Sequence, residues 1–156
     1  MRLIALCTAL GLLLAGPALA LDRREALDVV SLLEHLASER GETVYANGAE
    51  DWFEYDANQH GLIEAAGYGV DDWNRVYEDT IAAYLAGIPD DEYAVHFKAV
   101  EERIANSDLS AEHKQALFEE WRVIRAALDW RREAARPYAE LVRPLAGRIS
   151  VLMATD

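Results

Sequence analysis

One stretch of the chain carries several side chains that could bind a metal ion. Asp56 and Asn58 offer oxygen atoms, His60 offers an imidazole nitrogen, and Glu64 offers a second carboxylate. Gly61 lies among them, where a chain that wraps around an ion needs a sharp turn. The spacing therefore predicts a divalent-cation site, for calcium or zinc, with Asp56, Asn58, His60 and Glu64 as its ligands.

The same stretch, DANQHGLIEAAG over Asp56–Gly67, resembles an EF-hand calcium loop. Four residues match positions 1, 3, 6 and 9 of that loop: Asp56, Asn58, Gly61 and Glu64. Two residues depart from it, because His60 replaces an oxygen ligand and Gly67 stands where a bidentate Glu belongs. The resemblance implies a degenerate loop that binds calcium weakly. The alternative is that residues 58–61 simply break a helix.

The other reactive side chains form no recognised catalytic motif. His35 is expected on the polar side of its helix, near Glu39. The paired Glu-x-x-His motifs of di-iron bundles are absent, as are a nucleophile elbow, a phosphate loop and a dinucleotide fingerprint. We therefore expect no enzyme activity and no cofactor.

The C-terminal part carries residue types that are common at binding hot spots. We predict a partner-binding surface there, formed by Trp121, Trp130, Arg131 and Arg132. The alternative is that both tryptophans lie in the core. The nearby stretch LSAEHKQALFEEWR, residues 109–122, resembles the helix starts of small envelope-stress chaperones, over about seven residues and in one copy. That resemblance implies a chaperone-like binding module.

Helical periodicity runs through the whole chain after residue 20, whereas strand patterns are nearly absent. We expect an all-α bundle of about five helices in a single domain, residues 21–156. The first helix is expected to start near Asp22, and N-caps predict later helix starts at Asp71, Asp90 and Ser110. The last helix is predicted to be long and kinked near Pro137 and Pro144, with a helix break at these prolines as the alternative.

The first twenty residues are typical of a cleavable signal peptide. Arg2 precedes an apolar run, and Ala18 and Ala20 supply the small residues of a cleavage site. An uncleaved membrane anchor is the alternative, but the run is shorter than the roughly 20 residues of a spanning helix. We therefore expect a periplasmic or secreted protein with no membrane span in its mature form. Its mature chain has no disulfide, because Cys7 is the single cysteine.

The chain is strongly acidic, with 28 Asp and Glu against 15 Lys and Arg and a net charge of −13. Residues 41–95 carry most of this excess, with Arg75 as their one base. Such a surface repels nucleic acid and attracts cations and basic proteins. We expect a helical protein that acts by binding an unknown envelope protein. The alternative function is weak divalent-cation binding through residues 56–67.

Overall fold

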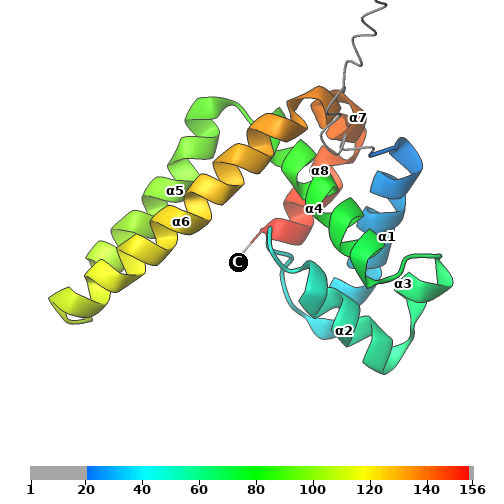
Figure 1. The fold of residues 1–156 in the computed structure, drawn as a ribbon, viewed down its shortest axis with the longest axis horizontal. Helices are drawn as coiled ribbons and strands as arrows, with labels where there is room; N and C mark the ends of the chain where they lie inside the picture. The colour runs from blue at the N-terminus through cyan, green and yellow to red at the C-terminus, as the bar shows by residue number, and fades with distance from the viewer. Residues whose placement is uncertain (1–20, 155–156) are drawn as a thin grey trace, which may run out of the picture.

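The computed structural model describes residues 21–154, and within that range the fold is all-α without strands, as the periodicity predicts. The predicted signal peptide lies outside the described residues. The α-helices are α1 (Arg23–Arg40), α2 (Ala49–Gln59), α3 (Leu62–Ala65), α4 (Val70–Gly87), α5 (Asp90–Ala105), α6 (Ala111–Ala135), α7 (Ala139–Val142) and α8 (Ala146–Met153). Figure 1 shows two parts, a compact body and a long hairpin formed by α5 and α6. We call residues 90–135 the α5–α6 arm.

Helix α4 forms the centre of the body. It contacts α1, α2, α6, α7 and α8 and buries Trp73, Val76, Tyr77 and Ile81 among them. Two of its aromatic side chains also hold the start of α2 and the loop before it. Trp73 Nε1 donates to the carbonyl of Ala49, the first residue of α2, at 2.8 Å, and the Tyr77 hydroxyl donates to the carbonyl of Tyr45 at 2.6 Å. These bonds satisfy polar groups that would be costly to bury unpaired.

The ends of α1 are set by local sequence. Asp22 and Glu25 form a capping box at its start, with bonds of 2.8 and 2.9 Å between side chain and backbone. Gly41 ends the helix in the left-handed conformation that favours glycine. The buried face carries Ala26, Val29, Val30, Leu33 and Leu36, which leaves the opposite face to solvent.

In the α5–α6 arm, one aromatic contact lies within α5 and another joins α5 to α6. The ring centroid of Phe97 lies 4.6 Å from that of Tyr93 and 5.5 Å from that of Trp121. Ser110 accepts a bond from the backbone of His113 and starts α6, as predicted. The far end of the arm extends away from the body (Figure 1), so its helices cover each other on one side only.

The chain after Ala135 is divided at each proline. Arg136–Tyr138 and Arg143–Leu145 form short 3₁₀ segments, η1 and η2, with Pro137 and Pro144 in their first turns, and α7 and α8 follow them. Proline suits such a position because it has no N–H to donate. Helix α8 returns to α1, where Arg148 pairs with Glu34 through two bonds of 2.7 and 2.6 Å.

None of the helices between residues 21 and 154 is both long enough and apolar enough to span a bilayer.

Candidate functional site

The predicted cation loop contains a buried carboxylate that is already used by the backbone. Asp56 is 1% exposed, and its two oxygens accept bonds from the N–H groups of Leu62 at 3.0 Å and Ile63 at 2.7 Å. Gly61 adopts a left-handed conformation, with φ of 64°, and turns the chain from α2 into α3. Asp56 thus stabilises a helix–turn–helix connection, because it caps the start of α3 from within α2.

The other predicted ligands do not gather around Asp56. The Asn58 side chain donates to the carbonyl of Glu54 at 2.8 Å, along its own helix. Glu64 is exposed on α3. In the described part of the chain, Asp56, His60 and Glu64 do not lie close enough together to share one ion. The loop therefore does not form the ligand set that its spacing predicts.

His60 instead lies against α1. Its Nε2 is 2.9 Å from Oε2 of Glu39, and Nε2 of His35 is 3.8 Å from the same oxygen. The three ligand atoms lie within 4.8 Å of one another. Among the side chains that the structure describes, these three form the group of His and acidic residues whose ligand atoms are gathered closely enough for a metal ion. The four-residue spacing of His35 and Glu39 is visible in the sequence, whereas the approach of His60 depends on how α2 packs.

The four predicted partner-binding residues occupy very different environments. Arg132 is only 7% exposed, and it donates to the carbonyls of Leu85 at 2.8 Å and Ile88 at 2.5 Å. Its guanidinium also pairs with Asp90 at 2.8 Å and lies over the ring of Tyr93. Arg132 thus joins the end of α4 to the start of α5 and is used within the protein.

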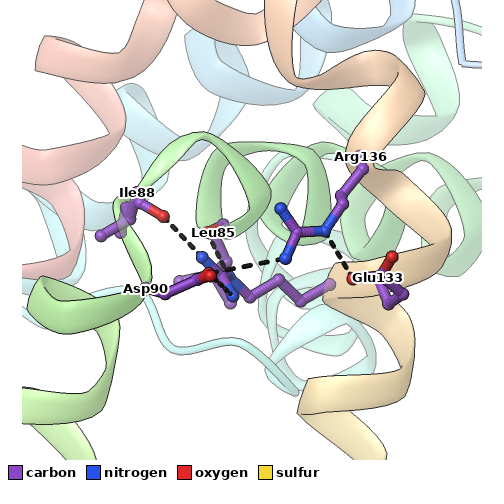
Figure 2. Close-up of polar contacts among 6 residues, drawn as sticks. Leu85, Ile88, Asp90, Glu133 and Arg136 are labelled. Carbon is purple, nitrogen blue, oxygen red and sulfur yellow. Dashed lines mark hydrogen bonds and ion pairs between the residues drawn. The ribbon is translucent and has the colours of Figure 1, made fainter.

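Figure 2 shows the carbonyls of Leu85 and Ile88 beside Asp90, with Arg136 on the other side of that carboxylate. Arg136 Nη2 lies 3.5 Å from Asp90 and its Nε lies 2.5 Å from Glu133. The hydrogen bond and charge of Arg132, with the charge of Arg136, hold the pKa of Asp90 below its ordinary value. The base of the arm is therefore fixed by a network of charged groups.

Of Trp121, Trp130 and Arg131, Trp130 is the one that exposes most of its side chain to solvent. Arg131 pairs with Glu78 of α4 at 2.9 Å, and Trp121 packs on Phe97 inside the arm. Trp130 is 71% exposed, and Val123, seven residues earlier and thus on the same face of α6, is 72% exposed. An exposed tryptophan is unusual because burying such a ring contributes strongly to stability.

An apolar groove of about 400 Å³ lies where the arm leaves the body. Residues from α4, α5, α6 and α8 line it, and they include Leu85, Ile88, Tyr93, Phe97, Leu128 and Met153. Ser150 and Ala46 also line the groove. No acidic or histidine side chain is among the described residues that line it, so the groove suits apolar binding better than acid–base chemistry.

Comparisons of the chain with protein-family models, with curated proteins and with solved structures each found no match.

Proposed function

We propose that the protein acts by binding another protein, and that the groove at the base of the α5–α6 arm receives an apolar side chain of that partner. The observation that carries the proposal is the groove itself, with its volume of about 400 Å³ and its mainly apolar lining. Apolar sites of this size are used for specific binding in many proteins. The amphipathic helices around it allow an added helix or extended segment to pack in the same way.

The exposed face of α6 supports the same proposal. Val123 and Trp130 lie two helical turns apart, about 10 Å along the axis. Both side chains expose most of their area to solvent and are available for contact with a partner. This face is a second apolar surface separate from the groove, because Trp130 lies two residues from the groove-lining Leu128 and thus on roughly the opposite side of α6.

The charge of the chain indicates what the partner segment carries beside its apolar anchor. The net charge of −13 attracts a basic partner and repels an acidic one. We therefore propose a basic amphipathic segment as the occupant. The N-terminal sequence supports a signal peptide over residues 1–20, and we propose that the partner is met in the periplasm or outside the cell.

Two labelled amphipathic peptides with the same apolar face, one rich in lysine and one rich in glutamate, test this proposal by fluorescence anisotropy. We expect the basic peptide to bind, and its affinity to fall as salt screens the charges. Ser150 lines the groove and is exposed, so Ser150→Phe fills the groove without disturbing the core. Because burying one anchor contributes about 1.5–3 kcal/mol, this variant should weaken binding at least about tenfold.

Ser38→Phe is the matched control, because Ser38 is exposed on α1 and does not line the groove. It should leave the affinity unchanged. The proposal is wrong if neither peptide binds, if the acidic peptide binds equally well, or if both serine variants behave alike. Suppression of the aggregation of a heat-unfolded test protein, lost in Ser150→Phe and kept in Ser38→Phe, would extend the result to a chaperone-like role.

A further inference from the structure

We propose that His35, Glu39 and His60 together bind a divalent transition-metal ion of the zinc class. This inference is independent of the proposed protein binding, since none of the three residues lines the groove. It also differs from the loop that the sequence predicts, because it shares only His60 with that set. Two helices supply the ligands: His35 and Glu39 come from α1, and His60 follows the last residue of α2.

The distances fit a shared ion. A zinc ion holds nitrogen and oxygen ligands at about 2.0–2.2 Å, so tetrahedral ligand atoms lie roughly 3.3 Å from one another. The Glu39 oxygen lies 2.9 Å from the His60 nitrogen and 3.8 Å from the His35 nitrogen, and all three atoms fall within 4.8 Å. These separations lie on both sides of the required value, so small side-chain rotations are enough to centre an ion.

The side chains are free to make those rotations. The exposed fractions of the His35, Glu39 and His60 side chains are 54%, 37% and 40%. Their backbones are held, because His35 and Glu39 lie within a capped helix and the N–H of His60 donates to the carbonyl of Asp56 at 2.8 Å. The site therefore has fixed ligand positions and adjustable ligand directions.

The ligand types select the metal. Two imidazoles and one carboxylate are a set that zinc binds, with water in the remaining position. Calcium prefers six to eight oxygen ligands and is poorly served by two nitrogens. Copper and nickel also accept imidazole, so selectivity within this class rests on availability as much as on the site.

The surrounding charges favour a cation. The neighbouring Arg40 is engaged with other groups, since its guanidinium lies 5.2 Å from the ring centroids of both Trp52 and Tyr55 and its Nε lies 2.8 Å from Glu42. The acidic excess of the whole chain adds a long-range attraction. In the absence of an ion, the contact between His60 and Glu39 is an exposed pair that contributes little to stability. A metal ion that displaces this contact therefore costs the protein little free energy.

Calorimetry and thermal melting of the purified protein, made without a polyhistidine tag, test the site with zinc chloride alone and with calcium chloride alone. We expect one zinc ion per chain and a zinc-dependent rise in melting temperature, because an ion bound only by the folded state stabilises it. Calcium should produce no shift. Replacing zinc with cobalt should give visible absorption bands that report nitrogen and oxygen ligands.

Single variants identify the ligands. His35→Ala, His60→Ala and Glu39→Gln should each weaken zinc binding at least about tenfold. Because these residues are exposed, we expect the melting temperatures of the metal-free variants to stay close to that of the unaltered protein. His113→Ala is the matched control, since His113 is exposed on α6 and bonds only to Ser110. Zinc binding that is absent, that survives both histidine variants, or that is lost equally in His113→Ala would overturn the proposal.

Discussion

Asp56→Ala is the substitution that most directly tests how the stretch 56–67 is used. The carboxylate of Asp56 accepts two backbone N–H bonds, of 3.0 and 2.7 Å, across the turn between α2 and α3. Hydrogen bonds to a charged group contribute about 1.5–3 kcal/mol each. Removing a buried carboxylate also removes its desolvation cost, which offsets part of this loss. We expect the free energy of unfolding to fall by about 2–4 kcal/mol.

This loss is large enough to measure, because a domain of this size is stable by only about 5–15 kcal/mol. Urea denaturation followed by circular dichroism, with linear extrapolation to water, gives the value. Asn58→Ala is the control from the same loop, since Asn58 is exposed and bonds only within its own helix. It should change the free energy of unfolding by less than about 0.5 kcal/mol.

Two results would refute this reasoning. One is an Asp56→Ala variant whose free energy of unfolding lies within about 0.5 kcal/mol of the unaltered protein, since a cap of this kind contributes more. The other is a rise in melting temperature with millimolar calcium that both variants abolish. That second result would make Asp56 and Asn58 ligands, as the EF-hand resemblance implies.

Two further predictions concern charged groups in the interior. Burial raises the pKa of Asp79 to about 6 against a usual 3.8, and Arg75 partly opposes this shift. The ionised carboxylate therefore destabilises the folded state. This cost is fully present above pH 6 and absent below pH 3.8. In urea denaturation, Asp79→Asn should therefore raise the free energy of unfolding by up to about 3 kcal/mol at pH 7.5. This gain should vanish near pH 3.5. A variant that is less stable than the unaltered protein at pH 7.5 would contradict the argument. Arg132→Lys should lower the free energy of unfolding by about 1–3 kcal/mol. Arg132 reaches Leu85, Ile88 and Asp90 from three different guanidinium nitrogens, whereas lysine has a single nitrogen that cannot occupy all three places. Arg122→Lys, an exposed change on the same helix, should have no measurable effect in the same assay, and equal effects in the two variants would remove the special role of Arg132.

The features that the sequence predicted well are local ones. Asp22 and Ser110 start helices because a side-chain oxygen accepts a bond from the first turn, whatever the rest of the chain does. The predicted caps Asp71 and Asp90 are wrong, since both lie inside the first turn of a helix whose N-cap is Gly69 or Pro89. The apolar stripe of α1 is buried for a similar reason, since its spacing alone decides which side chains share a face. Gly41 ends that helix through its left-handed conformation, which its residue type alone favours. These features together indicated the all-α class.

The features that the sequence did not predict depend on how distant elements meet. Arg132 looks like a surface hot-spot residue, yet it is buried because the last carbonyls of α4 need a donor at that place. Leu117 and Ile124 keep the spacing of a core stripe, yet they are 37% and 38% exposed because the far part of the arm has one neighbouring helix. The spacing groups His60 with Asp56 and Glu64, whereas in the structure it lies beside α1 for the same reason. Its closest carboxylate, Glu39, lies 21 residues away in the chain.

The two proposed sites occupy different parts of one molecule, and their tests can succeed or fail separately. The body closes around α4 and buries its large side chains, so it gains stability without a partner. The arm leaves Val123 and Trp130 exposed to solvent, where a partner can contact them. Zinc would link α1 to α2 and act on the body, whereas a protein partner would cover the groove and the arm. A peptide affinity that is unchanged by zinc, together with a zinc affinity that is unchanged in Ser150→Phe, would show that the two sites are uncoupled.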